Sequence, residues 1–519
     1  MSFIAKKILL LIIAILLISS SFYGCMRIEN PPASDTIDYI DHIDELPEPD
    51  DGKIKIHVVT EPESGDHNFN DVLSKVAKAY EKDNPGVKIQ IEVLSDASLE
   101  RENQMKLIRN GVLSGEGPDV FLLPGGQTNS RLLPLFFDVE LAMRNGMFYD
   151  ISDFYEDDEI LEKEYLNDII MEAGVLDGSR YVLPLYYDIP VVMIDSPIAD
   201  AYGIDTEKLK DNVMDMMDTL LETEDPMWCA GAYMGIANNF FCHDVFPDLI
   251  DYSSEEVMLT KDEIAAYMRK IQMLHSYVGQ LSPEAAYSVY DNSMKAYVNM
   301  GSNWNTAGLP IHVTTLNLAF EYAAISKSNN GQLEIFPLRA TDGSVNANVT
   351  YWGAVGAGSK HPDLAYDFLR IFLQEDVQWE RIRMDSNKVA NTEPWRLHSK
   401  DYNIPWGLVT TGWPVRSGDS VEYIWRSYYK SLHSYDIMSW GNEYYIQKLM
   451  DIAMEDTDFQ ILDVQIDEVR FSNKYEKDLS KDLASLNNGA NGFAPNMVDI
   501  EGMAMDAVLN LESLLYEGH

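Results

Sequence analysis

The chain has 519 residues, 46% of them hydrophobic, and its 84 acidic and 39 basic side chains give a formal charge of −45 at pH 7. This length and apolar content suffice for two or three domains with buried cores, which excludes a wholly disordered chain. The acidic charge disfavours nucleic acids and anionic substrates as partners. With three cysteines and no paired Cys/His motif, we expect no disulfide framework, no metal site and no cofactor.

The first residues form an export signal. Two lysines precede an unbroken run of eleven apolar residues at 8–18, which is too short for the ~20 residues that span a bilayer. The run leads to Phe22-Tyr23-Gly24-Cys25, which resembles the cleavage box of bacterial lipoproteins. We therefore predict a signal peptide over 1–24 and a lipidated Cys25; the alternative is plain secretion with a spare cysteine.

An acidic linker follows over residues 25–52. Positions 28–52 hold nine acidic residues, four prolines and no lysine or arginine. Such a composition stays extended and solvated. The segment is predicted to be a tether that holds a folded body, beginning at residue 53, away from a membrane.

Strand and helix periodicities alternate in the first part of this body. Apolar and polar residues alternate at 54–58 and 87–93, and apolar residues recur at helical spacing at 69–80 and 99–112. A continuous apolar run at 120–123 predicts a third, fully buried strand. This β-α-β-α-β pattern predicts a parallel sheet with helices on both faces.

Ligands of such sheets bind beyond the carboxyl ends of the strands. In this chain the predicted ends carry Glu61 after the first strand and Gln127 after the third. Asp119 precedes the third strand, where it is either a ligand contact or an anchor for its own strand. Later in the chain, apolar helical stripes over 362–372 and 500–515 predict two buried helices.

Several ordered segments resemble a known family. These segments are 53–93, LSGEGPDV at 113–120, GMFYDISDF at 146–154, LDGSRYVLP at 176–184 and VGAGSKHPDLA at 355–365. Together they resemble the family 1 extracellular solute-binding proteins of ABC importers, the group that includes maltose-binding protein. The likeness covers most of residues 53–385 and is loose over 205–300 and 395–495.

The resemblance implies an α/β, two-lobe periplasmic-binding-protein-like fold of type II. Each lobe would be a mostly parallel sheet flanked by helices, and hinge strands would join the lobes. The N-terminal lobe is expected over 53–187 plus about 337–388, and the C-terminal lobe over 188–336 plus about 389–519. The first hinge crossing is expected at 184–194.

The resemblance also implies a set of ligand contacts. Asp188 lies where relatives of the maltose-binding type place a carboxylate that accepts hydrogen bonds from sugar hydroxyls, and Trp304 lies where an aromatic ring stacks on a sugar. The alternative roles are a cap or hinge residue for Asp188 and core packing for Trp304. Tyr186 and Tyr187 point to opposite faces of an extended chain, so at most one can face the ligand. The other candidates are Trp352, Asn303, Trp440, Glu61, Asp119 and Gln127.

Cys229 and Cys242 enclose twelve residues. Outside the cell they can form a disulfide, which would stabilise the folded state by ~3 kcal/mol in the chain-entropy model. Two reduced buried thiols are the alternative.

The expected function follows from the export signal and the resemblance. Two lobes would close on a neutral solute, a mono- or oligosaccharide, and a monomeric, lipid-anchored receptor outside the cytoplasm would deliver it to ABC permease subunits. No GxSxG, HExxH or EF-hand pattern supports an enzyme. The alternatives are a sensor or adhesin lipoprotein of the same fold and, as the weaker one, a secreted carbohydrate-active enzyme.

Overall fold

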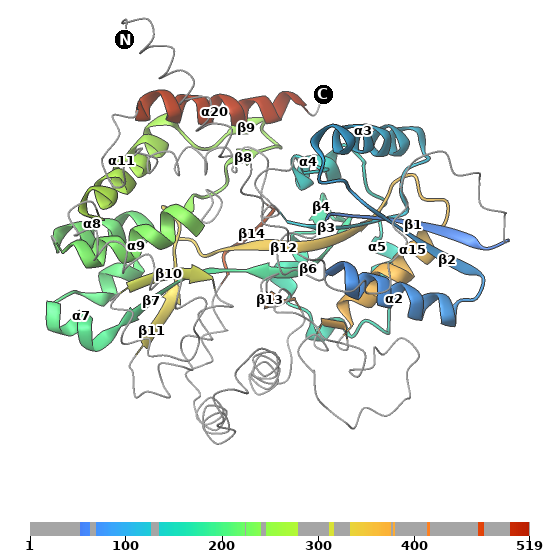
Figure 1. Ribbon diagram of the computed structural model, residues 1–519, viewed down its shortest axis with the longest axis horizontal. Helices are drawn as coiled ribbons and strands as arrows, with labels where there is room; N and C mark the ends of the chain where they lie inside the picture. Colours follow the sequence, from blue (N-terminus) through green and yellow to red (C-terminus); the bar gives the residue numbers. More distant parts are fainter. Residues whose placement is uncertain are drawn as a thin grey trace, which may run out of the picture. The chain divides into compact units, whose positions relative to one another are not determined.

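The computed structural model describes residues 52–62, 69–125, 134–223, 225–239, 245–278, 311–315, 333–374, 377–378, 413–415, 466–471 and 499–517 (Figure 1). All of them belong to one compact unit, Asp51–His519. The predicted signal peptide and nearly all of the predicted tether lie outside the described residues.

A seven-stranded sheet forms the centre of the first lobe. Its order is β13-β6-β12-β3-β1-β2, and β14 pairs with the first part of β12. The strands β1, β2, β3 and β6 are mutually parallel, while β12 runs antiparallel to its neighbours β3 and β6. The strands are β1 (Ile54–Thr60), β2 (Val87–Val93), β3 (Val120–Pro124), β6 (Val182–Asp188), β12 (Asn346–Val355), β13 (Trp413–Pro414) and β14 (Glu468–Arg470).

Helices cover both faces of this sheet because its strands are apolar on both sides (Figure 1). Val58 and Leu122 pack in one buried cluster with residues of α2 and α15. Val59 and Phe121, which alternate with them, pack in another with residues of α3 and α4. The helices of this lobe are α2 (Phe69–Asp83), α3 (Ser98–Ser114), α4 (Val139–Arg144), α5 (Ser152–Glu156), α6 (Asp168–Glu172) and α15 (Pro362–Leu369).

A smaller sheet, β10-β7-β11, belongs to the second lobe. Helix α9 approaches β10 closely, because a Cβ on Gly231 or Gly235 would overlap the carbonyl oxygens of Ile311 and Val313. The elements of this part are β7 (Pro190–Asp195), β10 (Ile311–Thr315), β11 (Leu333–Pro337), α7 (Ser196–Tyr202), α8 (Val213–Glu222), α9 (Pro226–Asn239), α11 (Lys261–Val278) and α20 (Ile500–Glu517).

The remaining elements are short. They are the strand pairs β4 (Val175–Leu176) with β5 (Ser179–Arg180) and β8 (Ile250–Asp251) with β9 (Glu256–Val257), and the 3-10 turns η1 (Lys163–Tyr165), η2 (Thr206–Lys210) and η3 (Arg370–Leu373).

The two sheets are joined by continuous chain. The strand β6 continues through Ile189 into β7, and β11 leads through a loop into β12. Along β7, Val191 and Met193 belong to the buried cluster that includes α2 and α15, whereas Val192 and Ile194 belong to the cluster of the second lobe. The predicted crossing at 184–194 therefore coincides with this junction.

The architecture differs from the expectation in two details. The described strands of the smaller sheet pair antiparallel, because β10 and β11 both run opposite to β7. The strands β13 and β14 lie in the segment assigned to the second lobe, yet they extend the large sheet. The lobe boundaries themselves stay a prediction.

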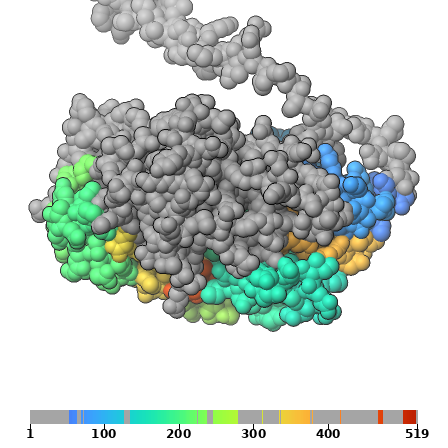
Figure 2. Space-filling model, turned by 90° about the horizontal axis from the view of Figure 1, so that it is seen from below, coloured from blue at the N-terminus to red at the C-terminus, as the bar shows by residue number. Residues whose placement is uncertain are grey.

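Part of the excess acidic charge lies in one solvent-exposed segment of the chain. Residues 150–172 carry ten acidic side chains and one lysine, and every one of these acids except Asp158 is exposed. The stretch lies within the turquoise surface of Figure 2. Because these carboxylates stay hydrated, they carry little desolvation penalty in the folded state.

Candidate ligand-binding site

The carboxyl ends of β1, β3 and β6 lie at one edge of the large sheet, since these strands are parallel. This edge carries Thr60, Gly125 and Asp188, and it is where the sequence predicts a ligand site. Gly125 is required there, because any Cβ at this position would overlap the carbonyl oxygen of Val349 as the chain leaves β3.

Glu61 lies at this edge in a buried ion pair. Arg101 Nη2 on α3 donates to Glu61 Oε1 at 2.6 Å, and the two side chains are 2% and 7% exposed. The Glu61 carbonyl also accepts a hydrogen bond from Asn70 Nδ2 at 3.0 Å. Glu61 therefore has a structural role beside the predicted ligand edge; its contact with a ligand stays a prediction.

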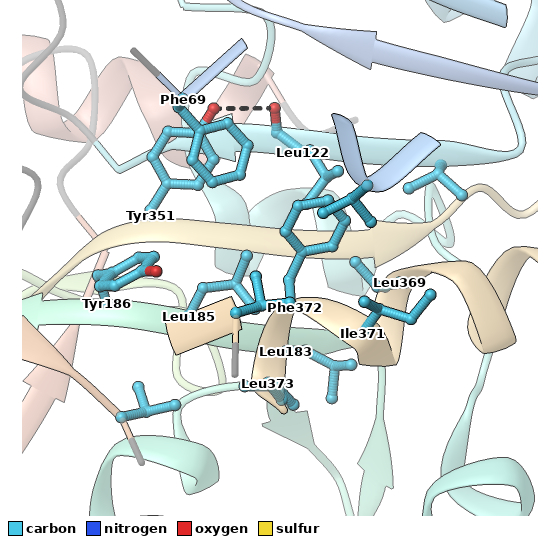
Figure 3. Close-up of a cluster of buried hydrophobic side chains, with 14 of the residues drawn as sticks. Phe69, Leu122, Leu183, Leu185, Tyr186, Tyr351, Leu369, Ile371, Phe372 and Leu373 are labelled. Atoms are coloured by element: carbon cyan, nitrogen blue, oxygen red, sulfur yellow. Dashed lines mark hydrogen bonds between the residues drawn. The ribbon is translucent and has the colours of Figure 1, made fainter. Parts of the chain in front are cut away.

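An aromatic and hydroxyl cluster packs against the same edge of the sheet. The ring of Phe69 lies 3.9 Å from that of Tyr351, measured between centroids. The Tyr351 hydroxyl lies 3.4 Å from Thr60 Oγ1 and donates to the Leu122 carbonyl at 3.5 Å (Figure 3). These contacts fix the end of β1 against β12 and β3.

Three polar side chains form a row across neighbouring strands at this edge. Asn348 on β12 is paired in register with Asp188 on β6 and with Arg470 on β14. Asp188 is half-buried, and its Oδ1 accepts from the Ile189 amide at 2.9 Å. Arg470 donates through Nη1 to the Phe246 carbonyl at 2.9 Å and pairs with Asp248 at 3.1 Å. The predicted ligand carboxylate therefore lies on the strand next to Asn348, and Arg470 lies on the strand on the other side of Asn348.

Asp119 precedes β3, at the end of the strand opposite to the predicted ligand edge, and its contact with a ligand stays a prediction. Its Oδ2 accepts from the His57 amide at 2.8 Å and its Oδ1 from Ser359 Oγ at 2.6 Å. The side chain is 9% exposed. The alternative role is the one observed, because Asp119 ties the start of β3 to β1 and to the loop before α15.

Trp352 is packed in the core of the first lobe. It is 2% exposed and lies among aromatic rings, with centroids 5.6 Å from Phe148, 6.1 Å from Phe136 and 6.3 Å from Phe471. The indole thus has a packing role, and its contact with a ligand stays a prediction.

Both hinge tyrosines are buried. Tyr186 and Tyr187 are 3% and 6% exposed, and both belong to the cluster beneath β12 that Figure 3 shows for Tyr186. Burial raises the pKa of the Tyr187 phenol above its ordinary value. Both side chains therefore pack in the core of the first lobe, and the contact of either one with a ligand stays a prediction.

Other predicted residues lie outside the described part of the chain. These are Trp304, Asn303, Trp440, Gln127, Cys25 and Cys242. Cys229 is described as a buried free thiol whose Sγ donates to the Leu220 carbonyl at 3.4 Å. Burial raises the pKa of this thiol to about 12, so it is protonated and unreactive near neutral pH.

The described segments supply no metal centre and no membrane span. Among them, no group of three or more His, Cys, Asp or Glu side chains is placed to hold a metal ion. In the same residues, no helix is long and apolar enough to cross a bilayer.

Sequence reasoning missed Arg101 and Asn348. Arg101 has a sequence signal, because it continues the buried stripe of Met105, Ile108 and Val112 along α3. For Asn348 the signal is a second asparagine two residues earlier in a mostly apolar strand. Asn346 and Asn348 must therefore share one face of β12.

Comparisons with known proteins identify the family. A family model described as bacterial extracellular solute-binding protein matches residues 67–379, which is more than half of the chain. No curated protein matches the sequence.

Among solved structures, the chain is similar to a family 1 solute-binding protein of Alicyclobacillus acidocaldarius, with 13% identity and a TM-score of 0.46 over 89% of this chain and 98% of that one. It is also similar to the galacto-N-biose/lacto-N-biose I-binding protein of Bifidobacterium longum, with 14% identity and a TM-score of 0.48 over 90% and 98%. The family match shows that the chain belongs to the family 1 extracellular solute-binding proteins of ABC transporters.

Proposed function

We propose that the protein is the substrate-binding lipoprotein of an ABC importer, which captures a neutral carbohydrate and delivers it to a permease. The lobes would close about the two chain crossings, β6 to β7 and β11 to β12, and the solute would stabilise the closed state by its higher affinity for that state. The lipid on Cys25 would keep the receptor at the membrane surface.

The observation that carries this proposal is the half-buried carboxylate of Asp188 at the ligand edge, next to the Asn348 amide. A carboxylate accepts several hydrogen bonds and donates none, so it suits the hydroxyl donors of a sugar. The net charge of −45 disfavours anionic solutes over neutral ones. The nine tryptophans and 29 tyrosines supply flat faces on which sugar rings can stack.

The test begins with a thermal-shift screen of the purified protein against neutral mono- and oligosaccharides. For a sugar that binds, Asp188→Ala is expected to weaken the affinity in calorimetry by about 10–100-fold, because it removes one charged hydrogen bond. The control is Glu102→Ala on the exposed side of α3, which should leave the affinity unchanged. Equal affinity of Asp188→Ala and the wild type would contradict the site.

The role in import needs a second measurement. Deleting the protein is expected to abolish uptake of the radiolabelled sugar by intact cells. Undiminished uptake together with a lost transcriptional response to that sugar would favour the sensor instead.

A further inference from the structure

The side chain of Asn348 is buried without hydrogen bonds. It is 1% exposed, and neither Oδ1 nor Nδ2 has a hydrogen-bond partner in the part of the chain that the structure describes. Buried amide groups are nearly always paired, so this residue requires an explanation.

Asn346 provides an internal comparison on the same face of β12. Its Nδ2 donates to the Phe246 carbonyl at 2.9 Å, and its Oδ1 accepts from Ser344 Oγ at 3.0 Å. Asn346 thus joins β12 to the segment of Phe246. Asn348, two residues further along, makes no such connection among the described residues. Its amide therefore adds no hydrogen bond that stabilises the fold there.

The neighbours of Asn348 determine what could pair with it. On one side lies Asp188, whose carboxylate only accepts hydrogen bonds, and on the other lies Arg470, whose guanidinium only donates. The Arg470 donors are directed to Phe246, Asp248 and Glu468. A partner for the Asn348 amide must donate to Oδ1 and accept from Nδ2, and a hydroxyl between the amide and Asp188 can also donate to that carboxylate.

Two adjacent hydroxyl groups of a sugar ring meet this requirement. The first hydroxyl donates to the Asp188 carboxylate and accepts from Asn348 Nδ2, and the second donates to Asn348 Oδ1. A receptor that surrounds its solute buries polar groups that only the solute can pair. The unpaired, buried amide of Asn348 agrees with that behaviour.

We propose that Asn348 is a specificity-determining ligand contact, which together with Asp188 reads a pair of neighbouring hydroxyls on the bound sugar. This inference rests on the proposed function and adds the chemical feature that the site selects. A deoxy sugar that lacks one of the two hydroxyls would leave one polar atom of the amide unpaired, and sites built to hydrogen-bond a hydroxyl bind such analogues much more weakly.

The test uses the purified full chain and the variants Asn348→Leu, Asn348→Ala and Asn346→Leu. Leucine is close to asparagine in size and removes the unpaired amide. Without sugar, Asn348→Leu is expected to melt at or above the wild-type temperature, whereas Asn346→Leu should melt lower because it breaks two hydrogen bonds. With D-glucose, D-galactose, D-mannose, maltose and lactose as probes, both Asn348 variants should bind the best sugar at least tenfold more weakly than the wild type.

Monodeoxy analogues of the best sugar assign the contact. For each of the two analogues that lack one recognised hydroxyl, the difference in affinity between the wild type and Asn348→Ala should shrink, while the other analogues should keep the full difference. Binding of the best sugar by both Asn348 variants as tightly as by the wild type would overturn the inference.

A melting temperature for Asn348→Leu as low as that of Asn346→Leu would also overturn it, because the amide would then have a structural partner. If the wild type bound none of the probes, the proposed function would fail together with the inference. If the wild type bound a sugar through Asp188 but not through Asn348, only the inference would fail.

Discussion

The ion pair between Arg101 and Glu61 permits a quantitative prediction of stability. Both side chains are more than nine-tenths buried, and the two charges meet at 2.6 Å beside the ligand edge. Arg101→Met keeps the apolar stem in place on α3 and removes the guanidinium. It leaves the Glu61 carboxylate buried without its counter-ion.

The expected loss is about 3–5 kcal/mol of unfolding free energy, because an uncompensated buried charge remains. Replacing both partners, in Arg101→Met/Glu61→Leu, removes that charge and should recover most of the loss, since apolar pairs of similar volume often replace buried ion pairs at little cost. The matched surface control is Arg144→Met, whose partner Glu140 lies one helical turn away at 2.8 Å. That variant should lose only about 0.3–0.5 kcal/mol.

Urea unfolding followed by near-ultraviolet circular dichroism measures these differences as shifts of the midpoint at constant slope. The reasoning requires the single variant to be far less stable than the double variant. The reasoning is refuted if the unfolding free energy of Arg101→Met is within about 1 kcal/mol of that of the Arg144→Met control. The buried pair would then stabilise the fold no more than an exposed one.

Three further predictions concern other parts of the chain. A fatty-acid probe in growing cells should label the wild type and not Cys25→Ser, and equal labelling would contradict the lipid anchor. Trp304→Ala should remove most of the ligand-induced change in tryptophan fluorescence, whereas Trp352→Phe should retain it; a signal that persists in Trp304→Ala would count against stacking there. Burial lowers the pKa of His275 below 6.5, so its neutral form stabilises the fold above about pH 6.5 and this contribution is lost as the pH falls. The melting temperature of His275→Phe should therefore fall less than that of the wild type between about pH 7.5 and 5.5, and a parallel fall in both would exclude this role.

The periodicities of the sequence predicted the main elements of the first lobe and the last helix of the second lobe well. The strands expected at 54–58, 87–93 and 120–123 are β1, β2 and β3, and the helices expected at 99–112 and 500–515 are α3 and α20. These elements are predictable because each one alone has a repeating pattern of apolar residues. The stripe at 362–372 is helical as well, but its second part tightens into the 3-10 turn η3.

The site was less predictable, because the same residue types serve as ligand contacts and as core residues. Trp352 is buried by Phe136, Phe148 and Phe471, which come from three separate segments that no local pattern connects to it. Asp119 is held by Ser359, 240 positions away in the sequence. Such distant partners decide a residue's role, and only the folded chain brings them together.

The division of β7 between two buried clusters has a consequence for how the protein unfolds. Val191 and Met193 contribute to one cluster, and Val192 and Ile194 to the other, so a single strand is common to both. Unfolding of either cluster would remove the side chains that pack on one face of this strand, and the other cluster would be destabilised at the same time. The lobes should therefore melt as one cooperative transition, and a substitution deep in one lobe should lower the resistance of the other to heat and to proteolysis.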